Sequence, residues 1–141
     1  MHAIELMEGL TSTVSEAGPG RWNVELETRN LLAAVKALRD AHWGYLSAIT
    51  GLDRGPDAGE LEILYHFCEA NQILTLRLTV SRDEAVVPSL TALIPSARLY
   101  EMELREMLGV TIQGLQAPSH LFLPDDWEEG TYPLRKDFAL S

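Results

Sequence analysis

Two adjacent alternating segments constrain the fold of this chain more than any other feature. In residues 61–67, Leu, Ile, Tyr and Phe occupy every second position, and in residues 74–80 Leu, Leu, Leu and Val do the same. Alternation with a period of two places the apolar side chains of a strand on one face. Residues 69–72 lie between the two segments and suit a hairpin turn. The sequence therefore predicts a β-hairpin with one buried face.

Helical spacing predicts two longer helices that could cover this face. The first follows Asn30, a suitable N-cap residue, and its apolar side is formed by Leu31, Leu32, Val35 and Leu38. The second begins at about Ser96 and ends at Gly109, which we expect to form a left-handed cap. Its expected buried stripe consists of Ala97, Tyr100, Leu104, Met107 and Leu108.

The remaining segments predict shorter elements. Four apolar residues near the start share one face of a short helix, which Gly-Pro-Gly at 18–20 would stop: Ile4, Met7, Leu10 and Val14. Residues 22–28 and 45–52 are expected to be strands. After Val110 the periodicity fades into a segment interrupted by proline and glycine. The predicted fold class is α+β: a small, mainly antiparallel sheet packed against helices, with an extended C-terminal tail.

Length and charge narrow the functional classes. A chain of 141 residues forms one domain, which we place at 1–141. Its 11 Lys and Arg residues against 21 Asp and Glu residues give a net charge of −10. This charge repels phosphates, so nucleic acid and anionic membrane surfaces are not expected partners. No apolar run approaches the roughly 20 residues that span a bilayer, and we expect a cytoplasmic protein.

Few residues suggest catalysis or metal binding. One cysteine, Cys68, excludes an internal disulfide and an all-cysteine metal site. His66 and Cys68 share one face of a strand, but a zinc site requires three or four ligands, so a partly buried histidine and a core cysteine are favoured. Gly-Pro-Gly at 18–20 is not a phosphate-binding loop. We predict no catalytic, cofactor-binding or metal-binding residue in this chain.

The second helix carries an unusual outer face. Opposite the expected stripe lie Leu99, Met102, Glu103 and Glu106. Leu and Met together are uncommon on a solvated face, so we expect these four residues to bind a partner, with isolated exposed apolar residues as the alternative. A general acid–base pair of Glu103 and Glu106 is a remote alternative, because it needs a pocket that separates their pKa values.

The tail contains the most specific residues. Its aromatic residues and its basic doublet in an acidic chain favour partner binding through Trp127, Tyr132, Pro133, Leu134, Arg135, Lys136, Asp137 and Phe138. The alternative is a tail that folds over its own domain. If the tail binds a partner, deleting it from Trp127 onward should leave a folded domain that no longer associates. Arg135→Glu should then weaken the association.

The same segments resemble the thirty-kilodalton subunit family of respiratory complex I, which includes the C subunit of bacterial NADH:quinone oxidoreductase and the J subunit of the chloroplast and cyanobacterial enzyme. Glu101, Glu103 and Gly109 match its acidic helix motif, with Glu106 at the position of an Asp. Its C-terminal motif is matched nearly completely within residues 126–138. The resemblance divides the chain into a core of about 30–123 and a partner-wrapping tail of about 124–141.

Some residues depart from the family pattern. Leu99 replaces a Trp, Met102 replaces an Arg, and residues 114–120 replace a Gly-His-Pro-Asp segment. The same domain occurs in energy-converting membrane-bound [NiFe] hydrogenases and formate hydrogenlyases. The resemblance therefore leaves open which complex the chain would join.

The resemblance implies a subunit without a redox centre in the peripheral arm, on the cytoplasmic side of a membrane-bound complex. It implies docking on the large subunit of the forty-nine-kilodalton type, which is related to nickel–iron hydrogenase large subunits, and contact with other peripheral-arm subunits. Its role would be to support electron transfer from NADH to quinone coupled to proton translocation.

Iron–sulfur clusters, flavin or nickel–iron would then belong to partner subunits, through which alone the chain would contact the membrane. A free-standing enzyme that uses Glu103 and Glu106, or His66, is the competing hypothesis, and it would turn over without partners.

Overall fold

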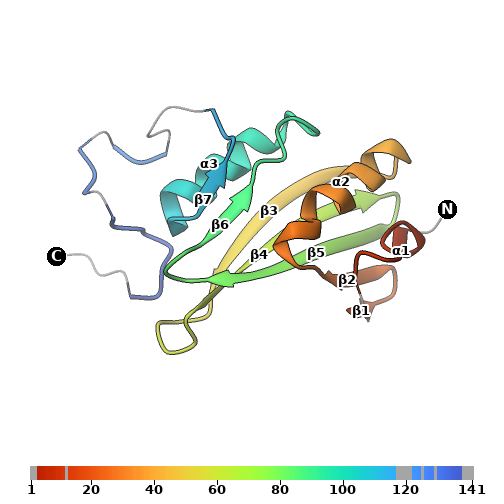
Figure 1. The fold of residues 1–141 in the computed structure, drawn as a ribbon, viewed down its shortest axis with the longest axis horizontal. Coiled ribbons are helices and arrows are strands. Elements are labelled where there is room, and N and C mark those ends of the chain that lie inside the picture. Colours follow the sequence, from red (N-terminus) through yellow and green to blue (C-terminus); the bar gives the residue numbers. More distant parts are fainter. Residues whose placement is uncertain (1–2, 12, 117–121, 125, 129, 138–141) are drawn as a thin grey trace.

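The chain forms a five-stranded mixed sheet with two helices on one face and a small two-stranded sheet beside them, as the computed structural model shows (Figure 1). The structure describes residues 3–11, 13–116, 122–124, 126–128 and 130–137. The strand order is β1-β2-β5-β4-β3. The α+β class and the mainly antiparallel sheet are therefore confirmed.

The predicted hairpin forms the centre of the sheet. β4 (Glu60–Glu69) pairs antiparallel with β5 (Gln72–Ser81), and Tyr65 lies opposite Leu76. Every second residue of both strands is buried, in the predicted phase: Leu61, Ile63, Tyr65, Phe67, Leu74, Leu76, Leu78 and Val80. At the turn, Ala70 adopts a φ of 52°, in the left-handed region that a tight reversal requires.

The other strands extend the sheet on both sides. β3 (Tyr45–Asp53) pairs antiparallel with β4 and ends the sheet. On the opposite side β2 (Arg21–Glu25) pairs parallel with β5, and β1 (Thr13–Gly18) pairs antiparallel with β2. After β2 the chain enters a 3-10 turn, η1 (Thr28–Asn30). The strand expected at 22–28 is thus shorter than predicted.

The N-terminal prediction of one helix up to residues 18–20 is wrong. Among the residues described there, the helix is limited to α1 (Ala3–Leu6), and Gly18-Pro19-Gly20 instead connects β1 with β2. Gly20 has a φ of 72°, and a Cβ on it would lie 2.9 Å from the carbonyl oxygen of Asn71. An isolated helix of this length is marginal in water, whereas a strand gains a backbone ladder against β2.

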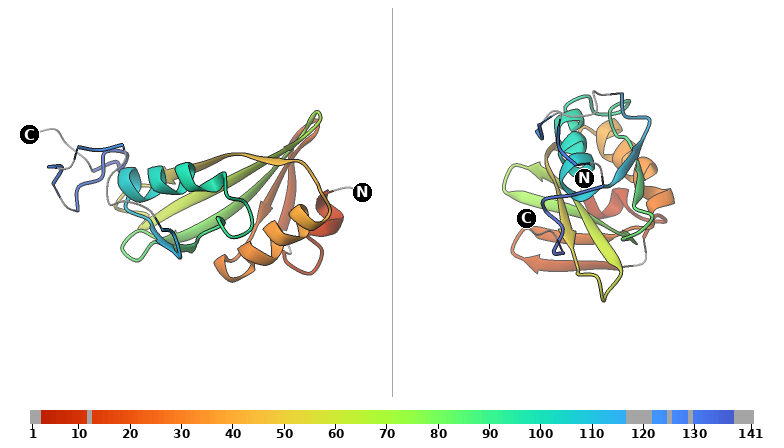
Figure 2. Two further views of the ribbon diagram at one scale, coloured as in Figure 1. Left: turned by 90° about the horizontal axis from the view of Figure 1, so that it is seen from above. Right: turned by 90° about the vertical axis from the view of Figure 1, so that its left-hand side faces the viewer.

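Both predicted longer helices are confirmed and pack on the same face of the sheet (Figure 2). They are α2 (Leu31–Asp40) and α3 (Ala97–Leu108). Asn30 precedes α2, but its side chain donates a hydrogen bond to the carbonyl of Leu10 (3.1 Å) instead of capping the helix. Gly109 ends α3 with a φ of 76°, as expected for a left-handed cap.

A short parallel pair was not predicted. β6 (Val86–Pro88) lies beside β7 (Thr111–Gln113), and β7 also contacts α3. Strands of three residues are too short to show a period in the sequence.

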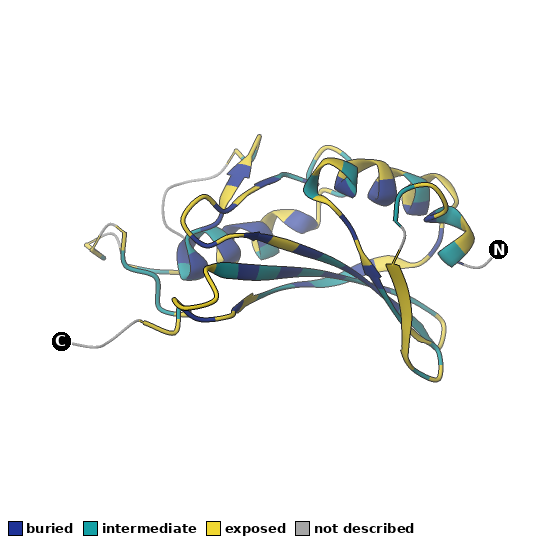
Figure 3. Ribbon diagram, turned by 60° about the horizontal axis from the view of Figure 1, so that its bottom comes forward, coloured by how far each residue is buried: buried dark blue, intermediate teal, exposed yellow. Residues whose placement is uncertain are grey.

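Burial follows this architecture (Figure 3). The buried segments concentrate on the central strands and on the sheet-facing sides of α2 and α3, whereas the β1–β2 hairpin and the C-terminal segment are largely exposed or half-buried. α1 and residues 130–137 lie at opposite ends of the molecule. Within the described ranges, no helix combines the length and apolar character needed to cross a membrane.

Candidate functional site

Of the four residues expected to form a partner-binding face on α3, two are exposed and two are buried. Leu99 is 54% exposed and Glu103 is exposed, as predicted. Met102 is completely buried and Glu106 is only 4% exposed, so the prediction that they face outward is wrong. The reason is that α3 is covered on a second side by other parts of the same chain, among them β7.

Glu106 holds the chain that follows β7. Its carboxylate accepts hydrogen bonds from the backbone N–H groups of Phe122 (3.1 Å and 3.2 Å) and Leu123 (3.2 Å). Glu103 instead remains on the exposed side of α3. The two carboxylates thus have separate surroundings, and Glu106 acts as an intramolecular anchor instead of half of an acid–base pair.

Glu101 forms a second internal anchor, which the sequence reasoning did not single out as buried. Its carboxylate accepts hydrogen bonds from the Ser89 hydroxyl (2.7 Å) and from the Leu90 backbone N–H (2.7 Å). Burial raises the pKa of Glu101, although these two hydrogen bonds act in the opposite direction. Burial, with a smaller contribution from the charge of Glu101, also raises the pKa of Tyr65. Glu101 therefore joins α3 to the turn after β6.

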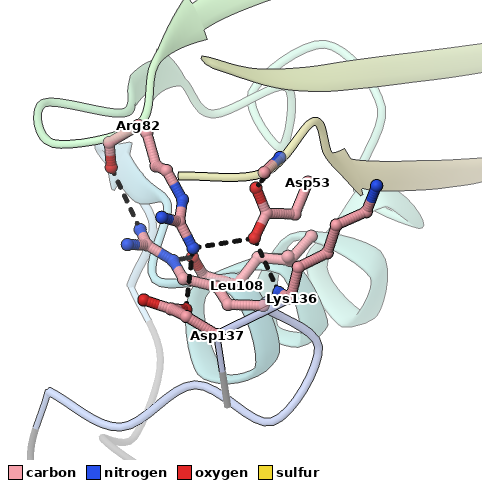
Figure 4. A network of polar contacts seen from close by, with 7 residues as sticks. Asp53, Arg82, Leu108, Lys136 and Asp137 are labelled. Carbon is pink, nitrogen blue, oxygen red and sulfur yellow. Dashed lines mark hydrogen bonds and ion pairs between the residues drawn. The ribbon is translucent and has the colours of Figure 1, made fainter. Parts of the chain in front are cut away.

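A cluster of charged residues around the buried Asp53 and Arg82 joins the tail to the ends of two strands (Figure 4). Arg82, just after β5, donates hydrogen bonds to Asp53 (2.8 Å) and to Asp137 (2.7 Å). Asp53, the last residue of β3, also accepts the backbone N–H of Lys136 (2.7 Å) and that of Gly55 (2.9 Å). We call Asp53, Arg82, Arg135, Lys136 and Asp137 the tail clamp.

Arg135 completes the tail clamp through backbone oxygens. Its Nε donates to the carbonyl of Leu108 (2.7 Å), and its Nη2 donates to the carbonyl of Arg82 (3.2 Å). The guanidinium also lies 4.9 Å from the ring centre of Tyr132. Leu108 ends α3, where unpaired carbonyls carry partial negative charge. The basic residue predicted to recognise a partner is therefore engaged within its own chain.

The ionised form of Asp53 is stabilised by this environment. Burial by itself opposes ionisation, but the N–H groups of Lys136 and Gly55 and the guanidinium of Arg82 hold the pKa of Asp53 below its ordinary value. The side chain of Asp53 is 1% exposed and that of Arg82 is 8% exposed. A buried pair with this many hydrogen bonds fixes the position of the tail relative to the sheet.

The other tail residues occupy different environments. The Trp127 Nε1–H donates to the Thr131 carbonyl (2.7 Å), and the ring is half-buried. Tyr132 and Pro133 are also half-buried, whereas Leu134 is 54% exposed and Lys136 and Asp137 are exposed. Phe138 lies outside the described residues. From 132 to 137, the alternative of a tail folded over its own domain describes the structure.

The Tyr132 ring occupies the space that a side chain at position 109 would need. A Cβ on Gly109 would overlap the Tyr132 ring, so the glycine serves both the left-handed cap and this contact. The hydrophobic ring thus anchors the tail beside the end of α3. The partner role predicted for Tyr132 is not tested by this contact, but part of the ring is covered by its own chain.

His66 and Cys68 are held by hydroxyl groups of neighbouring strands. The ring nitrogens of His66 lie 3.1 Å from the Thr75 hydroxyl and 3.2 Å from the Thr50 hydroxyl. Burial lowers the pKa of His66, which favours the neutral ring. The Cys68 thiol donates to the Ser47 hydroxyl (3.4 Å). In the part of the chain that the structure describes, no group of three acidic, histidine or cysteine side chains could hold a metal ion.

Asp53 and Arg82 form a buried ion pair that the sequence reasoning missed. Their contacts with the tail span 53 to 83 positions, and neither residue lies in a local motif. The polar clusters at Glu101, at Glu106 and at the tail clamp all hold one segment of this chain to another. These clusters therefore stabilise the fold of the chain itself.

Comparison with protein families identifies the family of the chain. Residues 24–141 match the family described as the 30 Kd subunit of respiratory-chain NADH dehydrogenase. The chain belongs to this family, and the resemblance noted in the sequence is confirmed. The match includes α3, its acidic residues and the whole tail.

Two curated relatives illustrate the family. The chain is 32% identical over 125 residues to the J subunit of NAD(P)H-quinone oxidoreductase from Prochlorococcus marinus (strain NATL2A), covering 82% of this chain and 70% of the relative. It is 32% identical over 147 aligned positions to the C subunit of NADH-quinone oxidoreductase from Parvibaculum lavamentivorans, covering 97% of this chain and 72% of the relative. These relatives are subunits of quinone-linked oxidoreductases.

Solved structures share the fold at lower identity. A chain in the structure of the membrane-bound sulfane sulfur reductase, an archaeal respiratory membrane complex, superposes with a TM-score of 0.85 at 22% identity, covering 97% of this chain and 83% of that chain. A trypsin-resistant fragment of Nqo5 gives a TM-score of 0.66 at 19% identity, covering 75% of this chain and 89% of the fragment. These two comparisons show that the fold is shared.

Proposed function

We propose that this chain is a structural subunit of a complex I-type NADH:quinone oxidoreductase. It docks on the large subunit of the forty-nine-kilodalton type in the peripheral arm and supports electron transfer coupled to proton translocation without carrying a redox centre itself. The observation that carries this proposal is the family match across residues 24–141, which includes the tail residues 135–137 that bond to the domain.

The tail clamp supports docking through preorganisation. Because Arg82, Asp53 and Arg135 fix the backbone of the tail, less conformational entropy is lost when a partner binds it. The clamp leaves Leu134 exposed and the side chain of Lys136 pointing away from the cluster (Figure 4). The predicted partner-binding residues with exposed side chains are Leu99 and Glu103 of α3 and Leu134, Lys136 and Asp137 of the tail. Of these, Asp137 is bonded to Arg82.

The partner subunits supply the redox chemistry in this proposal. Iron–sulfur clusters, flavin or nickel–iron belong to them, and contact with the membrane runs through them. The chain then lies on the cytoplasmic side of the complex. Its own buried carboxylates are engaged in holding the fold, which suits a subunit whose task is to position others.

A related assembly is the second candidate. The fold likeness to a chain of the archaeal sulfane sulfur reductase complex extends over 97% of this chain. This supports an equivalent subunit of another membrane-bound respiratory complex, such as an energy-converting [NiFe] hydrogenase or a formate hydrogenlyase.

Purification from native cells tests the proposal. A tagged full-length chain should co-purify in equal amount with a large subunit of the forty-nine-kilodalton type after mild detergent extraction, and mass spectrometry identifies the remaining subunits. Quinone reduction by NADH in the purified complex favours the first candidate, and hydrogen or formate turnover favours the second. A chain that purifies alone, or that turns over substrate without partners, contradicts the proposal.

A further inference from the structure

A groove lies between the outer edge of β3 and α3. Ile49, Thr50 and Gly51 of β3 line one side, Glu103 of α3 lines the other, and Leu134 of the tail closes it. Its volume is about 130 Å³, enough for one side chain but not for a cofactor. Gly51 lets α3 pack closely on β3 beside the groove, since a Cβ at this position would overlap Leu108.

β3 presents an unusually open edge beside this groove. It is the last strand of the sheet, and among the described residues its backbone pairs with β4 alone. The Tyr100 hydroxyl donates to the carbonyl of Ser47 (2.9 Å), near the start of the strand. For residues 49–52, no described side chain or neighbouring segment bonds to the outer backbone groups. Proteins usually protect such edges with lysine, proline or a short strand.

The composition of β3 offers little of that protection. Its nine residues contain no lysine, arginine or proline, and its only charged residue is Asp53 at the end. Two large side chains on the strand are exposed, Tyr45 at 66% and Leu52 at 44%. A long edge of this kind favours addition of another strand.

The residues around the groove extend this exposed surface from β3 to α3 and the tail. Leu99 lies one helical turn before Glu103 and is 54% exposed, as is Leu134 at the other end. Glu103 forms no ion pair with any residue that the structure describes. The surface therefore combines free backbone groups, apolar side chains and one unpaired negative charge.

We propose that this surface binds an extended, basic segment of the large partner subunit. The segment adds a strand to β3, inserts an apolar side chain between Thr50 and Leu134, and places a Lys or Arg against Glu103. The identity of the partner rests on the proposed function. The charge of the segment follows from Glu103 and from the net charge of −10 on the chain.

A second copy of this chain is a less suitable occupant. Pairing two β3 edges would bring together two chains that each carry a net charge of −10, and neither would supply a cation at Glu103. β3 contains no lysine or arginine to do so. Charge complementarity thus favours a basic partner over self-association.

Site-specific crosslinking in the assembled complex tests the contact. A photoreactive phenylalanine analogue replaces Leu52 in the tagged full-length chain, and the matched control carries it at Leu32, which is 40% exposed on α2. We expect Leu52 to crosslink to one segment of the large subunit that contains Lys or Arg, with a yield about tenfold above that at Leu32. Crosslinking to a second copy of this chain, or a yield equal to the control, overturns the proposal.

Charge reversal provides an independent test. Glu103→Lys should reduce the amount of large subunit recovered with the tagged chain at least about tenfold. Glu84→Lys, at another exposed acidic position, makes the same charge change and should leave recovery unchanged. Far-ultraviolet circular dichroism of the isolated variants checks that both remain folded. Equal recovery with both variants overturns the contact at Glu103.

The outcomes separate this inference from the proposed function. If the wild-type chain recovers no large subunit, the proposed function fails. If it recovers the large subunit while Leu52 gives no specific crosslink and Glu103→Lys has no effect, the subunit function stands and the β3 surface is not the contact.

Discussion

Asp53 and Glu101 show how single buried carboxylates respond to their surroundings. Hydrogen bonds from the tail and Arg82 keep the pKa of Asp53 low, whereas burial between α3 and the β6 turn raises that of Glu101. The two residues must therefore affect the pH dependence of stability with opposite signs.

Asp53→Asn should lower the free energy of unfolding by about 2 kcal/mol near neutral pH. The variant leaves the buried Arg82 with only the exposed Asp137 as a charge partner. Because the folded-state pKa of Asp53 is depressed, its contribution is fully present above the ordinary value of 3.8 and is lost as pH falls through the folded-state pKa. Urea unfolding of both proteins at several pH values should show the difference shrinking in acid. A difference that grows in acid contradicts this assignment.

Glu101→Gln should show the opposite trend. The folded-state pKa of Glu101 is raised above 4.5, so its contribution is largest below that value and is lost as pH rises through the folded-state pKa. Glutamine does not titrate, and its oxygen and amide group can replace the bonds to Leu90 and Ser89. As the pH is raised from about 4 to about 7, the free energy of unfolding of the variant should therefore increase relative to that of the wild type. Constant or declining relative stability would mean that Glu101 is well stabilised as a carboxylate.

At the scale of elements, α3 is the helix whose faces the sequence assigned incorrectly. Amphipathic spacing identified the stripe that packs on β3, but α3 is also covered by β7 and is bonded to residues 122–123. A helix between two layers has two apolar sides, and only the exposed Leu99 and Glu103 remain from the predicted outer face.

Met102→Asp distinguishes the two faces of α3. Met102 is completely buried, so a charge there should destabilise the isolated domain by about 3 kcal/mol or more. Leu99→Asp places the same charge on the exposed side of the helix and should change stability by less than about 1 kcal/mol. Thermal unfolding of the two purified variants makes the comparison. Equal stability of both would mean that Met102 faces solvent.

At the scale of the whole molecule, the tail clamp connects distant parts of the chain. It joins the end of β3, the end of β5 and the last turn of α3 to residues 135–137. The tail is therefore part of the domain as well as a candidate contact for a partner. Its removal should affect the stability of the domain itself.

Arg135→Glu should destabilise the isolated chain by about 2 kcal/mol. The substitution removes two hydrogen bonds to backbone carbonyls and places a negative charge at the negative end of α3. Lys136→Glu is the matched control, because its side chain is exposed and only its backbone N–H enters the clamp. Chemical unfolding without any partner should separate the two variants. If both unfold alike, Arg135 contributes only to assembly.

Local patterns in the sequence determined the β4–β5 hairpin, α2, α3 and the cap at Gly109. These features depend on alternation, helical spacing or a single backbone conformation, all of which act over a few residues. The same patterns identified the tail as distinctive, and the family resemblance drawn from it was correct.

Only the tertiary structure decided which structure the short, weakly patterned segments adopt and which partners the charged residues contact. Residues 13–18 form a strand because β2 offers them a ladder, and β6 and β7 exist only as a pair. Arg82 meets Asp137 across 55 positions, and Asp53 meets the backbone of Lys136 across 83. Such contacts leave no period in the sequence, because their energy appears only after packing has brought the ends of β3, β5 and α3 to one place.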